Sequence, residues 1–425
     1  MFQTLVNAWK IPDLRKKILY TLLLLIVFRF GSVIPVPGLS ADAMAELANS
    51  SNTLFGFFNN ISGGAFANAT IFAMSISPYI NSSIIMNLLT VAIPALERLS
   101  KEGEEGKKKI AQYTRYGTVI LAFIQAAGLY AMLQGGVTNP GVLSFITITV
   151  TFTAGTAFLM WLGEKITEKG IGNGISILIF VGIIARVPDG LNALWSYMAG
   201  KQFDIMSIIM VLVVLVFALL IIGFVVFIND GERRIPVQYA KRVQGRKMYG
   251  GQSTHIPLKV CLAGVIPIIF AMSILSFPQT IATMLGKNPT SGFWYGFLSI
   301  FQQDSWVYAV LYFLLIIFFT YFYTSIQFNP IEMANNMKAN GGFVPGLRPG
   351  KPTSDYIQKV LNKVTLIGAF ALAIVALVPV IAGMFSSLAL NIGGTSVLIV
   401  VSVALETVKQ LESQMLMRHY KGFLE

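Results

Sequence analysis

Apolar stretches of membrane-spanning length recur along the whole chain and are separated by polar segments. A helix needs roughly 20 apolar residues to cross a bilayer core that is about 30 Å thick. The pattern predicts ten such helices, at residues 18–35, 71–94, 112–133, 145–163, 174–188, 205–228, 258–284, 305–326, 365–386 and 392–410. The fifth stretch is short and begins on glycines, which leaves its ends the least defined. The sequence therefore predicts an all-α polytopic membrane protein.

Basic residues lie almost entirely in alternate connecting segments. Cytoplasmic loops of membrane proteins carry an excess of Lys and Arg. On one face the predicted loops collect most of the basic side chains, whereas the loops on the other face contain only Arg186, Lys201 and Lys287. The alternation holds across all ten spans, so both termini are predicted to be cytoplasmic.

Ten helices divide into two groups of five, and this parity has a consequence for the architecture. A group of five begins on one side of the membrane and ends on the other, so the second group is inverted relative to the first. The predicted halves are residues 1–190, with helices one to five, and residues 191–425, with helices six to ten. In folds of this kind the substrate path lies at the interface of the halves.

The composition supports the membrane assignment. Of the 425 residues, 55% are hydrophobic and 12% are charged, which leaves too few polar side chains to cover a water-soluble protein. A net charge of +12 could suggest nucleic-acid binding, but the basic residues lie in short segments between apolar stretches. That placement indicates membrane topology.

The first apolar stretch follows Lys10, Arg15, Lys16 and Lys17, which is the layout of a signal peptide. It is too long for the apolar region of a signal peptide, and no cleavage site of small residues follows it. We therefore expect a retained first helix that ends near Pro35.

The segment before the second span has an unusual composition. Residues 36–70 contain no Lys or Arg and end in a glycine-rich run. The run is too short and too polar to span a bilayer, yet it is apolar enough to be buried. Because nonhelical backbone at membrane depth survives only inside protein or beside water, a re-entrant plugging segment at residues 59–70 fits this composition. An ordinary surface loop is the alternative.

The second span is polar for a membrane helix, since it contains Ser75, Ser77, Asn81, Ser82 and Asn87. Such side chains are tolerated where they line water or pack against another helix. Both interpretations stay open for this span.

Two further spans contain residues that disturb helices. Gly170, Gly172 and Gly174 open the fifth span, where the spacing excludes a phosphate-binding loop and favours close helix packing. Pro267 and Pro278 predict a bend in the seventh span, which suits either a gating hinge or a static kink.

Two cytoplasmic segments, residues 229–257 and 329–364, are long, basic and rich in glycine and proline. Exposed basic loops next to a membrane attract anionic lipid. Defined turns at the glycines and prolines would instead let the loops dock a large partner.

Catalytic and metal-binding patterns are missing from the sequence. The two histidines, His255 and His419, lie in cytoplasmic segments, and neither a zinc-ligand set nor a nucleophile elbow can be assembled. We therefore expect no enzyme activity, no metal and no cofactor. The single cysteine, Cys261, has no disulfide partner. Arg29 is the exception in an uncharged interior, and we expect it to pack, to snorkel or to pair with a partner subunit.

A secondary transporter is the main competing class, because such folds also use inverted repeats. Transporters carry ionisable residues near the membrane midplane for coupling ions. Here Glu164 and Glu406 lie near helix ends, and the central positions are isoleucine and serine. An intramembrane protease would need a nucleophile and a base that the spans do not offer.

Long motifs, in a fixed order over nearly the whole chain, give the sequence a specific resemblance. They are SGGA at Ser62–Ala65, PYI at Pro78–Ile80, QYTRYGT at Gln112–Thr118, GIGNGIS at Gly170–Ser176, QSTHIPLK at Gln252–Lys259, AGVIP at Ala263–Pro267, NPIEMANNMKANGGFVPGLRPG at Asn329–Gly350 and GGTSVLIVV at Gly393–Val401. Together they resemble the SecY family, the pore-forming subunits of the bacterial Sec protein translocase. The paralogue used for accessory secretion is the nearest competitor, and the well-kept loops argue against it.

The resemblance implies a channel of two five-helix halves that close like a clamshell, with a constriction ring, a plug, and a lateral gate to lipid. Matched residue by residue, the ring falls on six isoleucines: Ile76, Ile80, Ile175, Ile179, Ile269 and Ile399. The plug falls on Ile61, Ser62, Gly63, Gly64, Ala65, Phe66, Ala67 and Asn68. The lateral-gate positions are Asn87, Gln125 and Ser273, and the partner-binding loop positions are Arg246, Lys247 and Arg348. Stiff, branched, uncharged side chains suit a ring that presses around a moving chain and closes to a dewetted constriction.

The resemblance further implies translocation of unfolded secretory preproteins across the bacterial plasma membrane, and sideways release of membrane-protein helices into lipid. The implied partners are the SecE and SecG subunits, the SecA motor ATPase, the ribosome and signal sequences. SecA or translation would supply the energy.

Overall fold

The computed structural model describes residues 2–49, 59, 61–200, 204–239, 242–244, 247–249, 253–262, 264–284, 293–302, 305–385 and 394–421. The chain forms two compact units, each assembled from separate parts of the sequence. The first consists of Met1–Leu212, Ser273–Tyr308 and Ser386–Glu425, and the second of Val213–Met272 and Ala309–Phe385. The predicted N-terminal half, residues 1–190, falls wholly within the first unit, while residues 191–425 contribute to both. The division into inverted halves stays a prediction.

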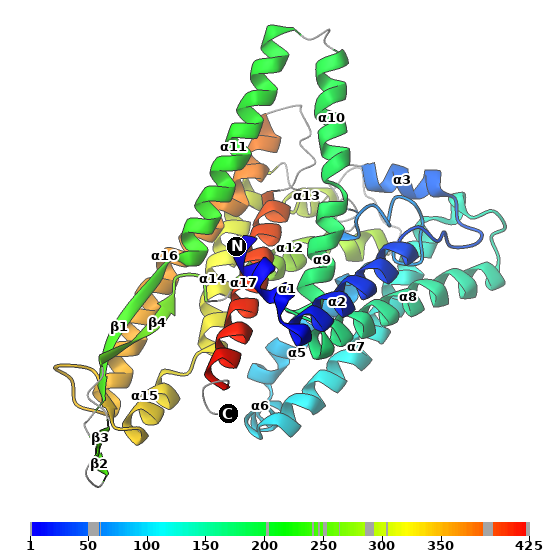
Figure 1. Cartoon of the computed structure of the whole chain (residues 1–425). Coiled ribbons are helices and arrows are strands. Elements are labelled where there is room, and N and C mark those ends of the chain that lie inside the picture. Colours follow the sequence, from blue (N-terminus) through cyan, green and yellow to red (C-terminus); the bar gives the residue numbers. More distant parts are fainter. Residues whose placement is uncertain are drawn as a thin grey trace. The chain divides into compact units, whose positions relative to one another are not determined.

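Helices make up nearly all of the first unit (Figure 1). Its own elements are α1 (Phe2–Lys10), α2 (Pro12–Gly31), α3 (Ala41–Asn49), α5 (Ser77–Ala92), α6 (Pro94–Lys101), α7 (Glu104–Met132), η1 (Gln134–Gly136), α8 (Val142–Lys169), α9 (Gly174–Ala185), α10 (Val187–Gly200), α13 (Phe293–Ser299) and α17 (Gly394–Lys421). Three more helices pass from one unit into the other: α11 (Ile205–Asp230), α12 (Ile266–Met284) and α14 (Trp306–Gln327).

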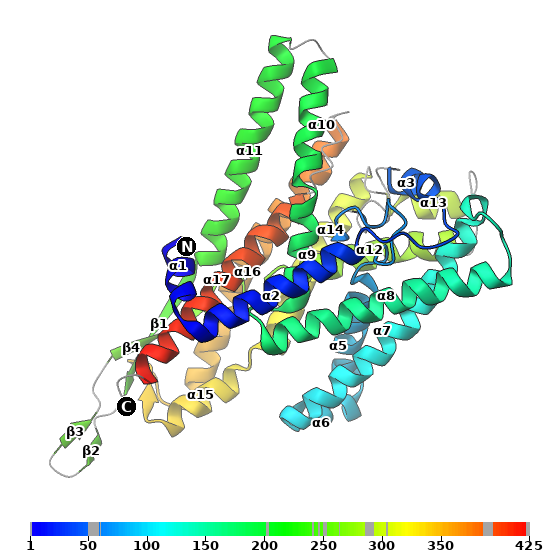
Figure 2. The ribbon, with the colours of Figure 1, turned by 45° about the vertical axis from the view of Figure 1, so that its right-hand side comes forward.

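Three helices of the first unit, α5, α7 and α8, pack side by side, as Figure 2 shows from the turned view. The hydroxyl of Ser82 on α5 donates a 2.8 Å hydrogen bond to the carbonyl of Thr114 on α7, at a level where Gly117 leaves room for the close approach. Near the other end of α7, the ring of Tyr130 meets Phe145 of α8 edge to face, with centroids 5.2 Å apart. Ser82 therefore holds two helices together, which is the packing interpretation of a polar residue in this span.

The helix of the second span is shorter than predicted. It begins at Ser77, and residues 71–76 are turns, although their composition is as apolar as that of the helix that follows. Ser75 has a positive φ of 52°, which an α-helix does not allow. The helix ends where Ile93 precedes Pro94, and α6 leaves at an angle of 100° to α5, because a residue before proline is driven out of the helical region.

Each of the ten predicted spans overlaps a helix of the structure. Five helical segments among the described residues are long and apolar enough to cross a membrane, or six if the bent pair α5 and α6 is one span. They are Val142–Lys169, Gly174–Gly200, Ile205–Asp230, Trp306–Ala339 and Lys351–Val378. The fifth span was predicted too short, because α10 continues it beyond Arg186 to Gly200. The chain is an all-α polytopic membrane protein.

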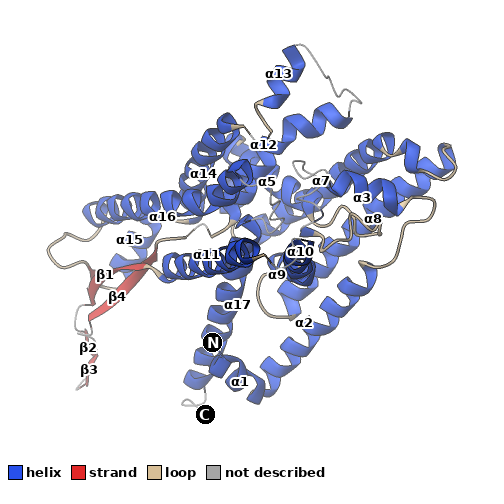
Figure 3. Ribbon diagram, turned by 90° about the horizontal axis from the view of Figure 1, so that it is seen from above, coloured by secondary structure: helices blue, strands red, loops and turns tan. Residues whose placement is uncertain are grey.

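Strands occur, among the described residues, only in the two long loops (Figure 3), and both loops belong to the second unit. The elements of this unit are β1 (Glu232–Tyr239), β2 (Arg242–Gln244), β3 (Lys247–Tyr249), β4 (Ser253–Lys259), α15 (Pro330–Ala339), β5 (Gly342–Phe343) and α16 (Lys351–Phe385). β1 lies between β4 and β5 in an antiparallel sheet, with Ile235 opposite Ile256. Ile235, Val237 and Leu258 share a small core with Met337, Val344 and Ile357 of the second loop and α16.

The hairpin corrects two expectations from the sequence. The first loop was expected to form turns, and β1 and β4 form a paired ribbon instead. The seventh span was predicted from residue 258, whereas residues 258 and 259 end β4 and α12 begins only at Ile266. Cys261 lies in the turn between them, where burial raises the pKa of its thiol to about 12.

Candidate functional site

The predicted plug is a buried chain of turns that is held together by its own polar groups. The side-chain oxygen of Asn59 accepts a 3.1 Å hydrogen bond from the backbone N–H of Ala67, eight residues later. The hydroxyl of Ser62 donates to the Asn59 carbonyl at 3.2 Å and accepts from the N–H of Phe66 at 3.2 Å. Thr70 donates through its hydroxyl and its N–H to the carbonyl of Ala65, at 3.0 and 3.1 Å. The segment thus satisfies its polar groups without a regular helix.

Burial of this segment excludes the alternative of an ordinary surface loop. Ile61, Ala65 and Phe66 are each no more than 2% exposed. Phe66 joins a core that includes Ile148 and Phe152 of α8. Asn60, which was included in the predicted range, lies outside the described residues.

Glycines on three helices allow the plug and the turns after it to approach closely. A β-carbon at Gly182 of α9 would lie 2.1 Å from the Ile61 carbonyl oxygen. One at Gly155 of α8 would lie 2.0 Å from the Ile71 carbonyl oxygen, and one at Gly31 of α2 would overlap the ring of Phe72. At Gly182 and Gly155 the added carbon would meet backbone atoms, so the plug packs against α9, and the turns after it against α8, at positions that favour glycine.

The backbone fastens the plug to the chain that leaves α2. The N–H of Val36 donates to the carbonyl of Ala69 at 2.8 Å, and the N–H of Ile71 donates to the carbonyl of Ile34 at 3.0 Å. These bonds flank an isolated antiparallel bridge between Pro35 and Thr70. The end of the plug is therefore anchored to the chain that leaves α2, while its Gly63–Gly64 turn bonds within the plug, where the N–H of Gly64 donates to the carbonyl of Asn59 at 2.9 Å.

Five of the six predicted ring isoleucines lie in the first unit, and Ile269 lies in the second. Ile76, Ile179 and Ile399 are buried, at 1%, 4% and 3% exposure. Ile80 and Ile175 are half-buried and stand one helical turn from Ile76 and Ile179.

Ile179 and Ile399 lie on two helices that pack against each other, α9 and α17. A β-carbon at Gly172 would lie 3.4 Å from the hydroxyl of Thr407, which fixes one point of contact. The two helices run in opposite directions (Figure 1). Ile179 lies five residues after Gly174, where α9 begins, and Ile399 lies eight residues before Thr407 on α17. The plug reaches the same region, since Gly182 follows Ile179 by less than one turn.

Two predicted gate residues, Asn87 and Gln125, lie on the neighbouring helices α5 and α7. Ser82 of α5 contacts Gly117 of α7. Asn87 lies five residues after Ser82 on α5, and Gln125 lies eight residues after Gly117 on α7. The two helices run in opposite directions, so the two residues are separated by roughly 20 Å along the helix axes. The side-chain oxygen of Gln125 is buried and has no hydrogen-bond partner among the described residues. The structure does not bring these two side chains together. Ser273 is half-buried on α12, and its carbonyl accepts a 3.0 Å bond from the Ser276 hydroxyl.

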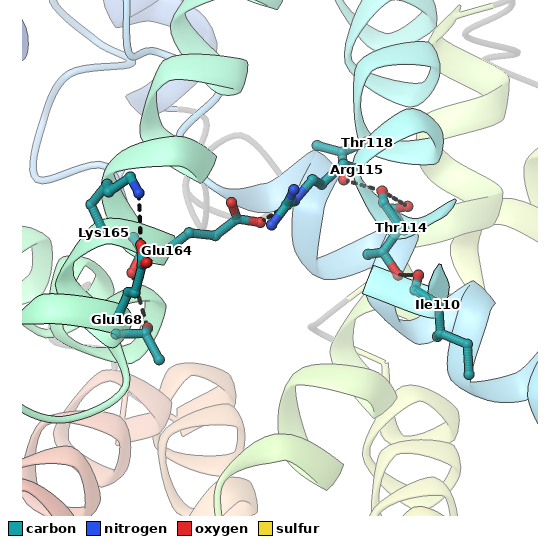
Figure 4. A network of polar contacts seen from close by, with 10 residues as sticks. Ile110, Thr114, Arg115, Thr118, Glu164, Lys165 and Glu168 are labelled. Atoms are coloured by element: carbon teal, nitrogen blue, oxygen red, sulfur yellow. Dashed lines mark hydrogen bonds and ion pairs between the residues drawn. The ribbon is translucent and has the colours of Figure 1, made fainter. Parts of the chain in front are cut away.

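An ion pair that the sequence interpretation missed ties α7 to α8. Nε of Arg115 lies 2.6 Å from Oε1 of Glu164, with the Arg115 side chain about half exposed (Figure 4). Glu164 had been noted only as a helix-end acid. Next to it on α8, Lys165 pairs with Glu168 at 2.6 Å. Since α5 is fastened to α7 through Ser82, the three helices form one connected group.

The glycines at the start of the fifth span serve close packing, as predicted. A β-carbon at Gly174 would lie 2.0 Å from the carbonyl oxygen of Gly163 on α8. Asn173 caps α9, and its side-chain oxygen accepts from the N–H groups of Ile175 and Ser176. This tight turn positions Ile175 in the first turn of the helix.

Of the three predicted partner-binding residues, the structure describes the side chain of Arg348 only. Arg348 is exposed in the turn between β5 and α16, and its carbonyl accepts a 2.9 Å bond from the hydroxyl of Thr353. Gly346 and Gly350, on either side, have φ values of 82° and 106°, so the turn is defined by positions that favour glycine. Lys247 lies in the short strand β3, and Arg246 lies outside the described residues.

No group of three or more His, Cys, Asp or Glu within the described ranges is arranged to hold a metal ion. The side chains of Asn59, Ser62 and Thr70 bond to backbone groups of the plug.

Comparison with known proteins gives concordant results at the levels of family, sequence and fold. The SecY family model matches residues 70–408. The chain is 48% identical to the protein translocase subunit SecY of Halalkalibacterium halodurans, with both chains covered completely. It is 46% identical to the subunit of the same name from Escherichia coli K12, over 97% of this chain and 94% of that one.

Solved structures share the fold. A protein-conducting channel superimposes with a TM-score of 0.69 at 20% identity, over 94% of this chain and 92% of that one. A SecY structure, described as showing that the plug domain stabilises the closed state and maintains a membrane seal, gives 0.66 at 19% identity over the same shares. Sec61 in the canine ribosome–channel complex gives 0.65 at 18% identity, again over 94% and 92%. Family model, full-length relatives and fold agree, and the chain belongs to the SecY family.

Proposed function

We propose that this chain forms the pore of a protein-conducting channel, which translocates unfolded secretory preproteins across the bacterial plasma membrane. The observation that carries the proposal is the buried plug, packed against Gly182 of α9 inside a SecY-family fold. A transporter of small solutes has no need of a removable folded segment in its path. A channel for a polypeptide must open widely and then close against ions, and a displaceable plug supports that cycle.

The six isoleucines form the constriction in this proposal. Burial of Ile76, Ile179 and Ile399, and the contact between the helices that carry the last two, support this assignment. Apolar, branched side chains close such a ring by dewetting and make no sequence-specific contact with the passing chain. Release of membrane-protein helices into lipid uses the side of the channel, where Asn87, Gln125 and Ser273 lie in the implied gate.

The partners follow from the relatives. The canine channel is described in complex with a ribosome, and the yeast Ssh1 complex is described as bound to the 80S ribosome. We propose that this chain binds the ribosome or the SecA ATPase through its cytoplasmic loops, with Arg348, Lys247 and Arg246 in the contact, and assembles with SecE and SecG. Both termini face the cytoplasm, in line with the charge alternation along the sequence.

Reconstitution tests the proposal directly. Purified chain with SecE and SecG is placed in vesicles, and SecA, ATP and a preprotein are added outside. Protease-protected preprotein, dependent on ATP and on an intact signal sequence, is the expected result. Uptake of a small solute without preprotein transport would favour the transporter class instead.

A further inference from the structure

Arg29 lies in the last turn of α2 and is bonded to the plug. Its Nη1 donates a hydrogen bond of 3.3 Å to the carbonyl oxygen of Gly63. Phe28, beside it, is buried, whereas the Arg29 side chain is exposed on the same helix end. A charged donor makes a stronger hydrogen bond than a neutral one. The bond therefore links a rigid helix to a nonhelical turn 34 residues later in the chain.

The backbone conformation at Gly63 and Gly64 directs the carbonyl of Gly63 toward Arg29. Gly63 and Gly64 have φ values of 68° and 86°, a consecutive left-handed pair that other residues rarely adopt. The carbonyl of Gly64 is used within the plug, where it accepts from the side chain of Asn68 at 3.1 Å. Gly63 also lies against α9, because a β-carbon on it would lie 2.9 Å from the carbonyl oxygen of Gly182. The same turn thus meets α9 through packing and α2 through the guanidinium.

Arg29 lies at a helix end that favours its positive charge. A cation in the last turn of a helix is favoured by the partial negative charge of the unpaired carbonyls there. Gly31, two residues on, lies close to the ring of Phe72, because a β-carbon at Gly31 would overlap that ring. The helix end that carries the donor therefore packs against the turns that follow the plug.

We propose that Arg29 is a positioning residue that latches the Gly63–Gly64 turn of the plug in the closed channel, an inference that rests on the function proposed above. One charged hydrogen bond is strong enough to bias the plug toward its seat and weak enough to break when a polypeptide enters. The competing roles for Arg29 are snorkelling to lipid headgroups and pairing with another subunit, and neither requires the plug.

Thiol labelling of the plug separates these roles. In the assembled complex with Cys261→Ser, the substitution Ser62→Cys places a probe at a plug position that is 1% exposed. Leu159→Cys, at a position on α8 that is 0% exposed, is the matched control in the same unit. Each probe is combined with native Arg29, with Arg29→Met, which keeps the length but removes the donor, and with Arg29→Lys.

Loss of the latch should raise the labelling rate of the plug probe about tenfold in Arg29→Met, which corresponds to about 1.4 kcal/mol. The control probe should keep its rate, and Arg29→Lys should recover part of the protection, because lysine retains a charged donor. An unchanged rate at the plug probe overturns the proposal. An equal rise at both probes also overturns it, because Arg29 would then stabilise the whole unit and not the plug.

Preprotein transport by the unsubstituted complex is measured in parallel. Transport together with unchanged plug labelling in Arg29→Met removes the latch and leaves the channel function standing. Absence of transport by the unsubstituted complex removes the channel function itself, and with it the gating role given to Arg29.

Discussion

Gly182 offers the sharpest test of how the plug is seated. A methyl group placed there by Gly182→Ala would have its carbon 2.1 Å from the carbonyl oxygen of Ile61. A carbon and an oxygen need at least about 3 Å, so the plug backbone must retreat by roughly 1 Å. Overpacking of this kind costs typically 1–3 kcal/mol. The cost falls on the closed state alone, provided that the plug leaves α9 when the channel opens.

A closed state weakened by about 1.4 kcal/mol is populated about tenfold less relative to the open state. The complex with Gly182→Ala should therefore leak ions in a planar bilayer at least several-fold more than the unsubstituted complex. It should also pass preproteins with defective signal sequences. Gly223→Ala is the matched control, because Gly223 also lies within a helix, α11, and nothing lies within 4 Å of the position that its β-carbon would occupy.

The refuting result is specific. If the Gly182→Ala complex assembles, with resting conductance and signal-sequence selectivity equal to those of the Gly223→Ala complex, then contact between Ile61 and α9 does not hold the channel closed. Loss of yield without leakage would mean that the residue contributes to folding and not to the seal.

Three further predictions concern the ring, the loops and the helix group. Ile399→Asn puts a poorly satisfied amide into a buried site at a cost of about 1–3 kcal/mol, so planar-bilayer conductance should rise, and unchanged conductance in folded protein would assign Ile399 to helix packing. Arg348→Glu reverses an exposed charge and should change the free energy of unfolding by less than about 0.5 kcal/mol while lowering SecA-driven transport; wild-type transport would remove it from the docking contact. Arg115→Gln and Glu164→Gln should each lower the free energy of unfolding in detergent by about 0.5 kcal/mol, with a coupling below about 1 kcal/mol in a double-mutant cycle; strictly additive losses would show that the pair adds nothing.

The helical type of the spans and their approximate positions were readable from the sequence because membrane spans must be apolar and helical. The start of the second span was not readable. Residues 71–76 are as apolar as a helix, and what turns them is contact with Gly155 and Gly31, which are distant in sequence. Hydropathy records burial and not backbone shape, so a buried turn and a buried helix give the same signal.

The hairpin in the first loop did leave a signal. Ile235 and Val237 alternate with exposed residues, and so does Leu258 on the facing strand. This period of two indicates a half-buried strand. Pro236 and Pro257 lie within the two strands, and because proline is typical of turns, the loop was interpreted as turns. The depths of Asn87 and Gln125 could not be predicted, because they depend on the register between α5 and α7, and that register is set by Ser82 against Gly117.

The turn that carries Arg348 is joined to the membrane by one continuous element. From Lys351 to Val378, α16 is a single helix of 28 residues, about 42 Å long at 1.5 Å per residue. A helix of this length resists bending and stretching far more than a loop does. If a docked partner displaces the turn, the displacement is therefore transmitted along α16 to its apolar portion, because the helix is continuous from Lys351 to Val378. In the proposed channel, the end of α16 next to Arg348 would therefore move together with the apolar end of the same helix.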